Sequence, residues 1–183
     1  MLMNIETIKK IEGEADCLCD SQGLNNVLDE LARKITSDLK DKNPILLCVM
    51  TGGLIPTGHL VTRLTFPLQL DYIHATRYQG ETSGGELHWV QKPSISLEGR
   101  VVLIIDDIFD EGITLREIAA YCKESGASEI HSCVLVNKRH NRKTEYTPTY
   151  IGLELEDRYL FGFGMDYKNY LRNTNAIYAV KGM

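Results

Sequence analysis

The chain has 183 residues, of which 43% are hydrophobic and 25% are charged, a composition typical of one globular domain with a sizeable core. Its formal net charge of -5 argues against a broad nucleic-acid-binding surface. No stretch approaches the roughly 20 continuous apolar residues that span a bilayer. We therefore expect neither a nucleic acid nor a membrane as a partner.

The cysteines and the first residues of the chain bear on its compartment. There are five cysteines, an odd number, and they show neither a disulfide framework nor zinc-site spacing. Cys48 and Cys133 fall inside apolar runs, where we expect them to be small core residues. The N-terminus lacks the basic start and apolar run of a signal peptide. These features predict a reducing, cytoplasmic location.

Residues 5–40 are predicted to form two helices around a break at residues 20–23. In the second helix Leu24, Leu28 and Leu31 recur at helical spacing, which indicates a packing layer without chemistry of its own. Residues 41–44 end in Asn-Pro and stop this helix.

A continuous apolar run at residues 45–50 predicts a buried strand, and residues 54–64 have a helical pattern. Thr51, Gly52 and Gly53 lie between them. Strand, Gly-Gly and helix is the layout of a phosphate cradle, although Gly-Gly is also an ordinary tight turn.

Residues 68–75 alternate apolar and polar side chains, which predicts a strand with one solvated face. Residues 77–85 contain three glycines and little to bury, and residues 87–90 look like a returning strand. Such a loop can be an active-site lid or a tolerated surface hairpin, and the sequence leaves both open.

The central stretch of the chain is residues 101–115. An aliphatic strand buried on both faces leads to Asp106 and Asp107, and a polar turn with Asp110 and Gly112 opens a helix over residues 115–121. Unpaired amides at a helix start favour an anion, and glycine allows close backbone approach. The simpler alternative is a loop whose Asp or Thr caps the helix.

Further strands are predicted at residues 130–136, 150–155, 159–164 and 176–180, with a left-handed helix end at residues 125–127. A basic run at residues 137–143 follows the first of these strands. Such a run is usually a solvated loop, but it lies again at the carboxyl end of a strand.

Strands that alternate with helices predict an α/β fold with a doubly wound, mostly parallel sheet flanked by helices. The loops at the carboxyl ends of the strands gather on one edge of such a sheet. Here they carry glycine turns, carboxylates, basic residues and an aromatic side chain. This combination suits a polyphosphorylated sugar with Mg²⁺, which prefers a few carboxylates and substrate oxygens, together with a flat heterocycle.

Residues 102–114 closely resemble the diphosphoribose-binding signature of the type I phosphoribosyltransferases. Residues 157–167 resemble the branch that acts on 6-oxopurines, the hypoxanthine-guanine phosphoribosyltransferases of purine salvage. The likeness runs from about residue 45 to the C-terminus. It implies one type I phosphoribosyltransferase domain over residues 1–183, with an N-terminal helical segment to about 43, a small hood from about 145 and a flexible lid loop.

The resemblance implies a transferase that forms IMP or GMP and pyrophosphate from 5-phosphoribosyl 1-diphosphate and hypoxanthine or guanine. Asp110 would be the catalytic acid/base group facing N7 of the purine, assisting attack by N9. The remaining residues implied for the phosphoribosyl diphosphate site are Asp106 and Asp107 at the ribose hydroxyls, Glu111, Gly112, Ile113 and Thr114 at the 5′-phosphate, and Thr51, Gly52, Gly53 and Arg172 at the pyrophosphate.

On the purine side, the resemblance gives Lys138 a hydrogen bond to O6, which disfavours adenine because its amino group is a donor there. Tyr159 would stack on the base and backbone groups around Leu160 would read its edge. Asp166, beside the base, would bind a second Mg²⁺, with Asp106 and Asp107 serving the first. Arg77 and Tyr78 would head the lid.

The chain departs from the better-known pattern at two places. Many members carry a lysine where Thr51 stands, and a Ser-Tyr pair where Arg77 and Tyr78 stand. Each implied residue also has a structural alternative: Asp110 as a helix cap, Tyr159 as a core aromatic, Arg172 as a surface charge.

Two other functions stay open. One is a regulator that kept the fold and acts on nucleic acid, for which the acidic chain offers only residues 138–143 as a basic patch. The other is an enzyme of the same fold that uses xanthine or a pyrimidine. The apolar N-terminal helices make a homodimer or homotetramer plausible.

Overall fold

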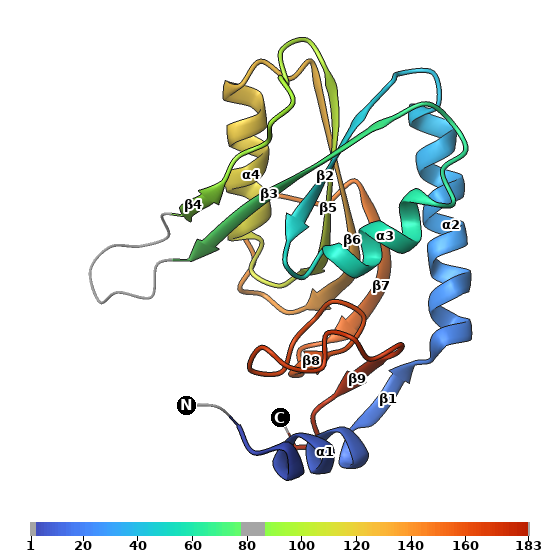
Figure 1. The fold of residues 1–183 in the computed structure, drawn as a ribbon, viewed down its shortest axis with the longest axis vertical. Helices are drawn as coiled ribbons and strands as arrows, with labels where there is room; N and C mark the ends of the chain where they lie inside the picture. The colour runs from blue at the N-terminus through green and yellow to red at the C-terminus, as the bar shows by residue number, and fades with distance from the viewer. Residues whose placement is uncertain (1–2, 78–86, 183) are drawn as a thin grey trace.

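The computed structural model describes residues 3–77 and 87–182 (Figure 1). Four helices and nine strands lie in these ranges, in the order α1 (Ile5–Glu14), β1 (Asp16–Cys19), α2 (Ser21–Leu39), β2 (Ile45–Met50), α3 (Leu54–Val61), β3 (Gln69–Arg77), β4 (Leu87–Gln91), β5 (Val101–Phe109), α4 (Ile113–Glu124), β6 (Glu129–Arg139), β7 (Tyr150–Glu156), β8 (Leu160–Phe161) and β9 (Ile177–Ala179).

Six strands form the main sheet in the order β4-β3-β2-β5-β6-β7. Only β4 is antiparallel to its neighbour β3; the other pairs are parallel. The chain leaves β2 toward β3 on one side and returns to place β5 on the other side of β2. The order of strands therefore reverses between β2 and β5, which is where open α/β sheets bind ligands, outside the carboxyl ends of the strands.

Helices cover both faces of this sheet, with α4 on one face and α2 and α3 on the other (Figure 1). Side chains of one strand point alternately to the two faces. Leu46 packs in the cluster with Leu28 and Leu31 of α2, whereas Leu47 packs with Ile118 of α4. Burial on both sides explains why β2 and β5 are continuous apolar runs, and it confirms the predicted doubly wound, mostly parallel sheet.

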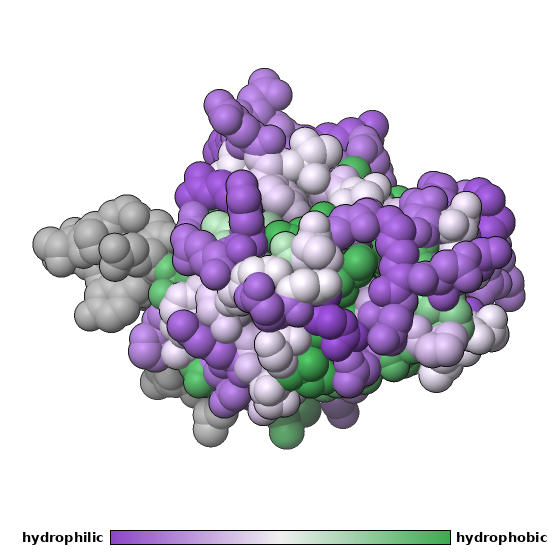
Figure 2. Space-filling view, turned by 90° about the horizontal axis from the view of Figure 1, so that it is seen from above, coloured by the Kyte–Doolittle hydropathy of each residue, from purple (hydrophilic) through white to green (hydrophobic). Residues whose placement is uncertain are grey.

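The amino ends of the parallel strands face the viewer in Figure 2, where hydrophilic surface predominates. Polar side chains from the loops at this end pair with one another. Lys42 Nζ lies 2.7 Å from Glu129 Oε1, and Arg100 Nη1 donates to Gln69 Oε1 at 2.6 Å. The amino ends of the parallel strands are therefore covered by polar side chains that face solvent.

A second, three-stranded sheet has the order β1-β9-β8. With residues 162–176 between β8 and β9 it forms the hood, which lies beyond the carboxyl ends of the main sheet (Figure 1). The predicted break at residues 20–23 was wrong in detail, because Asp16–Cys19, which had been assigned to a helix, form β1 and α2 already begins at Ser21. Asp20 then caps α2, accepting a hydrogen bond from Gly23 N at 2.8 Å. The hood is therefore built from both ends of the chain, not from the C-terminal segment alone.

The predicted strand at residues 68–75 is confirmed as β3, but its two faces are reversed. The face that carries Asp71 is buried, and the face that carries Leu70 and Tyr72 is exposed to solvent. Leu70 and Tyr72 are 51% and 47% exposed, whereas Asp71 and Ile73 are buried. Asp71 accepts hydrogen bonds from Ser94 N at 2.7 Å and Ile95 N at 2.8 Å. Burial alone raises the pKa of Asp71, but the hydrogen bonds from the amides of Ile95, Tyr72 and Ser94 and from the Ser94 hydroxyl outweigh it, and the pKa is lowered.

Smaller differences concern the ends of elements. The predicted strand at residues 159–164 is only Leu160–Phe161, because Gly162 and Gly164 have φ of 96° and 109°. The helix end at residues 125–127 is confirmed, since Gly126 has φ of 82° and Ala127 N donates to Cys122 O at 3.1 Å. Within the described ranges, each helix is too short or too polar to cross a membrane.

Candidate active site

A cavity of about 520 Å³ opens at the carboxyl ends of β2 and β5, at the reversal of the strand order. Its walls come from the loop after β2, the end of β5, the start of α4 and the hood. Of the residues predicted for phosphoribosyl diphosphate, the cavity is lined by Thr51, Gly52, Asp106, Asp107, Asp110, Gly112, Thr114 and Arg172, and Asp166, predicted for the purine side and as a metal ligand, lines it too. Gly53, Glu111 and Ile113 belong to the same turns but do not line it.

Asp106 and Asp107 are both buried near the end of β5, with 8% and 7% exposure. Each carboxylate accepts one backbone hydrogen bond at 2.9 Å, Asp106 from Asp107 N and Asp107 from Ile108 N. Burial, together with the charge of Asp107, raises the pKa of Asp106 well above its ordinary value. Burial also raises the pKa of Asp107, against the effect of Arg172, whose Nη1 lies 4.0 Å from Asp107 Oδ2. A cation or several hydroxyl donors would relieve this uncompensated charge.

The loop after β2 runs directly against this acid pair. A Cβ on Gly52 would meet Asp107 Oδ2 at 2.1 Å, and one on Gly53 would meet Ile105 O and Val49 O at 2.7 Å. The Gly53 amide donates to Val49 O at 2.9 Å, so this amide is already engaged. Gly52 is therefore required for the close approach of the Asp107 carboxylate, and Gly53 for the close approach of two backbones, whatever ligand binds there.

The turn after β5 aims the start of α4 at the cavity. Gly112 is the N-cap of α4 with φ of 83°, and a Cβ there would meet the Phe109 ring at 2.4 Å. The N-cap residue is Gly112 and not Asp110, so the alternative of Asp110 as the helix cap is wrong. The first amides of α4 and its dipole are thus directed at the space between Gly112 and Thr114, where an anion is favoured.

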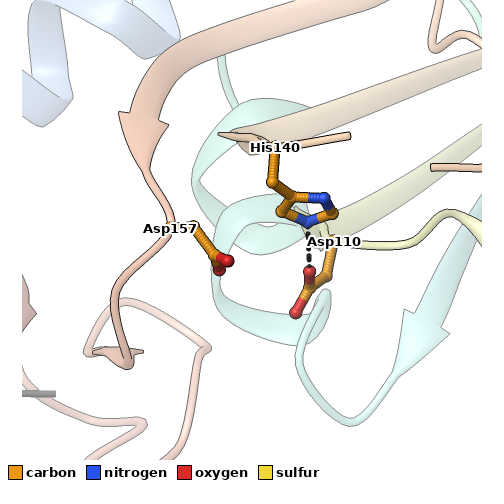
Figure 3. A group of neighbouring side chains, drawn as sticks. All are labelled: Asp110, His140 and Asp157. Atoms are coloured by element: carbon orange, nitrogen blue, oxygen red, sulfur yellow. Dashed lines mark hydrogen bonds and ion pairs between the residues drawn. The ribbon is translucent and has the colours of Figure 1, made fainter. Parts of the chain in front are cut away.

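Asp110 instead faces strand β6. Its Oδ1 lies 2.6 Å from His140 Nε2, and its Oδ2 lies 3.3 Å from Lys138 Nζ. Figure 3 shows Asp110 with His140 and Asp157. Lys138 Nζ lies at the same 3.3 Å from Asp157 Oδ1, so one ammonium bridges two carboxylates. The Lys138 and His140 side chains are 12% and 6% exposed. This arrangement fixes Asp110 at the rim of the cavity.

His140 and Asp157 were missed by the sequence reasoning. Residues 137–143 had been assigned to a loop, but β6 continues to Arg139 and pairs Asn137 with Phe109 of β5. Alternate residues of an extended chain share a side, so Lys138 and His140 both face the residue after Phe109. An extended chain continued from residue 136 as far as residue 140 would have predicted this pair.

A second cavity of about 310 Å³ adjoins the first and shares Asp107, Ile108, Asp110 and Asp166 with it. Lys138, Tyr159, Leu160 and Met165 complete its lining. Tyr159 is 39% exposed and meets Tyr167 edge-on, with ring centroids 5.2 Å apart. Tyr159 therefore lies partly exposed on the wall of this cavity and is not a core aromatic.

Arg172 and Asp166 come from the hood. Arg172 Nη2 lies 2.6 Å from Asp166 Oδ1, and Arg172 Nη1 donates to Gly164 O at 2.6 Å. Asn169 N donates to Asp166 Oδ2 at 2.7 Å. The guanidinium is thus oriented by two partners toward Asp107, and the reading of Arg172 as a solvated surface charge does not hold.

The predicted lid residues are placed only in part. Arg77 is the last residue of β3, and Tyr78 lies outside the described residues together with the rest of 78–86. The lid therefore stays a prediction.

Comparison with known proteins agrees with this geometry. Residues 15–169 match the phosphoribosyl transferase domain family. The chain is 32% identical over 165 residues to a hypoxanthine-guanine-xanthine phosphoribosyltransferase of Tritrichomonas foetus, covering 90% of each chain. It is 28% identical over 177 residues to a hypoxanthine-guanine phosphoribosyltransferase of Aquifex aeolicus, covering 95% and 99%.

Solved structures show the same relation. A hypoxanthine phosphoribosyltransferase of Staphylococcus aureus superimposes with a TM-score of 0.88 at 26% identity, over 98% of this chain and 97% of that one. The enzyme of Trypanosoma cruzi in complex with the product IMP gives a TM-score of 0.86 at 26% identity, over 92% and 96%. The chain belongs to the phosphoribosyltransferase family, in its hypoxanthine-guanine branch, as residues 102–114 and 157–167 had indicated.

Proposed function

We propose that the two joined cavities carry out the reaction of this branch, the transfer of a phosphoribosyl group from 5-phosphoribosyl 1-diphosphate to hypoxanthine or guanine. The products are pyrophosphate and IMP or GMP, which makes the chain a purine salvage transferase. One observation carries the proposal: Lys138 Nζ and Asp110 Oδ2 lie 3.3 Å apart on the wall of the smaller cavity. A 6-oxopurine presents O6 and N7 side by side on one edge, within reach of such a pair.

Lys138 gives the site its choice of base. Its ammonium donates to O6 of a 6-oxopurine, an acceptor. Adenine presents an amino donor at that position, so two donors would face each other and the hydrogen bond from Lys138 to the base would be lost. Sites that reject a ligand in this way discriminate by large factors. Tyr159 offers its ring to the flat face of the base.

Asp110 accepts the proton that leaves N7 of the purine. As N9 bonds to C1 of the ribose, the bond from C1 to the pyrophosphate oxygen breaks, and the proton at N7 passes to the Asp110 carboxylate. General acid–base assistance of this kind is worth roughly 10²–10⁴ in rate. The transition state has oxocarbenium character at C1, so the remaining work is to position both substrates and to stabilise charge.

The larger cavity holds the sugar and its phosphates. The start of α4 with Thr114 binds the 5′-phosphate, and Asp106 and Asp107 accept the ribose hydroxyls. Because the Gly53 amide is already bonded to Val49 O, we assign the pyrophosphate to the amides of Thr51 and Gly52, with Arg172 as its cation.

The residues present fit Mg²⁺. Asp106 and Asp107 are buried carboxylates with raised pKa, and a few carboxylates with substrate oxygens and water are the ligands this ion prefers. Asp106 and Asp107 would hold one ion and Asp166 a second. When bound, Mg²⁺ would neutralise charge on the leaving pyrophosphate.

The test is a steady-state assay with phosphoribosyl diphosphate, Mg²⁺ and each of hypoxanthine, guanine, xanthine and adenine. We expect turnover with 6-oxopurines, little with adenine, and a fall in kcat of about 10²-fold or more for Asp110→Asn. Asp29→Asn, which removes a carboxylate that is 68% exposed on α2, is the matched control. Binding of phosphoribosyl diphosphate without turnover of any purine would overturn the proposal in favour of a regulator.

A further inference from the structure

His140 lies against the proposed acid/base group, and its hydrogen bonds define its tautomer. The backbone N–H of Arg142 donates to His140 Nδ1 at 3.1 Å. A neutral imidazole has one donor and one acceptor nitrogen. Since Nδ1 accepts, the ring proton is on Nε2, which then donates to Asp110 Oδ1 at 2.6 Å.

This hydrogen bond leaves the two oxygens of Asp110 in different surroundings. Oδ1 is occupied by a side chain that is 6% exposed, whereas Oδ2 is the oxygen beside Lys138 Nζ. Figure 3 shows the His140 ring directly above the Asp110 carboxylate, on one side of it only. Oδ1 is therefore held by His140, and Oδ2 is the oxygen next to the group proposed to bind O6.

We propose that His140 is a positioning residue, which holds Asp110 so that Oδ2 receives the N7 proton next to the group that binds O6. This inference rests on the proposed function. His140 touches no substrate; it acts through Asp110. The proton moves from N7 to Oδ2, while the proton on His140 Nε2 stays where it is.

Asp110, His140 and Asp157 also place an oxygen or nitrogen atom each within 4.8 Å of one another, a spacing that a metal ion could use. Their other partners favour a hydrogen-bonded network. Lys138 Nζ lies 3.3 Å from both carboxylates, and Arg142 Nη2 lies 2.8 Å from Asp157 Oδ2. Two cations already neutralise the two carboxylates, and the Nε2 lone pair that a metal would need carries a proton.

The first variants are His140→Leu and His140→Gln. Leucine fills the space but cannot donate to Asp110. Glutamine can donate through its amide nitrogen and accept from Arg142 N through its amide oxygen. We expect kcat to fall by about 10- to 100-fold in the leucine variant, a part of the roughly 10²–10⁴ of acid–base assistance, and to recover most of that loss in the glutamine variant. KM for phosphoribosyl diphosphate should change by no more than about twofold in both.

A double-mutant cycle distinguishes a positioning role of His140 from a nonspecific structural effect of its substitution. If His140 acts through Asp110, His140→Leu should slow the Asp110→Asn enzyme hardly at all, because the group it orients is already disabled. His131→Leu is the matched control. His131 Nε2 also lies 2.7 Å from a carboxylate, that of Glu129, but at the amino end of β6, so its loss should leave kcat unchanged.

Three results would overturn the inference. The first is an unchanged kcat in His140→Leu, and the second is an equal loss of kcat in the leucine and glutamine variants. The third is that His140→Leu lowers kcat by the same factor in the Asp110→Asn enzyme as in the unsubstituted one. Circular dichroism establishes that each variant is folded. If the leucine variant does not fold, His140→Ser takes its place, because serine is too short to reach Asp110. Failure of the proposed function itself is distinguishable, since the unsubstituted chain would then turn over no purine.

Discussion

The lack of space around Gly52 predicts the effect of adding one methyl group there. In Gly52→Ala the added Cβ would lie 2.1 Å from Asp107 Oδ2 and 2.5 Å from the carboxyl carbon. To reach 3.4 Å, where ordinary contact begins, that oxygen has to move by about 1.3 Å. The loop has little room to retreat, because Gly164 packs on its other side, so close that a Cβ on Gly164 would meet Gly52 O at 2.2 Å.

A displacement of about 1 Å in a positioned catalytic group can cost roughly 10² in rate. We therefore expect kcat/KM for phosphoribosyl diphosphate to fall by about 100-fold. Forcing a methyl group into a packed site should also lower the free energy of unfolding by about 1–3 kcal/mol. Steady-state kinetics at saturating hypoxanthine, with phosphoribosyl diphosphate varied, measure the first quantity, and denaturant titration measures the second.

Gly58→Ala is the matched control. Gly58 lies inside α3 with no atom within 4 Å of an added Cβ. Alanine in a helix is favoured over glycine by about 0.5–1 kcal/mol, so this variant should keep its activity and gain stability. An unchanged kcat/KM in a folded Gly52→Ala enzyme would refute the claim that an alanine at this position displaces the Asp107 carboxylate and that this displacement impairs the site.

Two further predictions concern buried polar groups. Lys138→Ala should lower kcat/KM for hypoxanthine by about 10- to 100-fold, which corresponds to the loss of a hydrogen bond from a charged group. It should leave kcat/KM for adenine nearly unchanged. Parallel assays with both bases check this, and an equal loss for both would contradict the role given to Lys138. Asp71→Asn should lower the free energy of unfolding at pH 7 by about 1–3 kcal/mol, because a carboxylate that accepts several backbone hydrogen bonds is replaced by an amide. The folded pKa of Asp71 is lowered, so its contribution is present above its ordinary pKa and is lost as the pH falls through the lowered value. Denaturant titrations at pH 7 and below pH 4 should therefore show a smaller loss on acidification in Asp71→Asn than in the unsubstituted chain, and equal losses would count against this account.

The main sheet and the site at its edge could be predicted because their causes are local in the sequence. Strands buried on both faces must be apolar throughout, as in residues 45–50, and a loop that approaches an acid pair must contain glycine. Residue types at strand ends therefore predicted Asp106, Asp107, Gly52 and Gly112 correctly as neighbours in space.

The parts that escaped prediction depend on distant segments. Strand β1 has four residues and exists because Asp16 pairs with Ala179 at the other end of the chain. Asp71 is buried because backbone amides at residues 94 and 95 satisfy it, which no periodicity within β3 could indicate. His140 was obscured by a run of charged neighbours whose strand character comes from pairing with β5 and β7.

The same distant pairing contributes directly to the site. Arg158 Nη2 donates to Asp16 Oδ2 at 2.6 Å and to Val180 O at 3.1 Å, and Val180 N donates to Tyr159 O at 2.9 Å. The backbone of Tyr159 is thus fixed to the last strand of the hood, which is itself held by the first strand of the chain. The end of β5 supplies Asp106 and Asp107, whereas Tyr159, Asp166 and Arg172 come from the hood. A binding site for two substrates therefore arises only when the two ends of the chain have met.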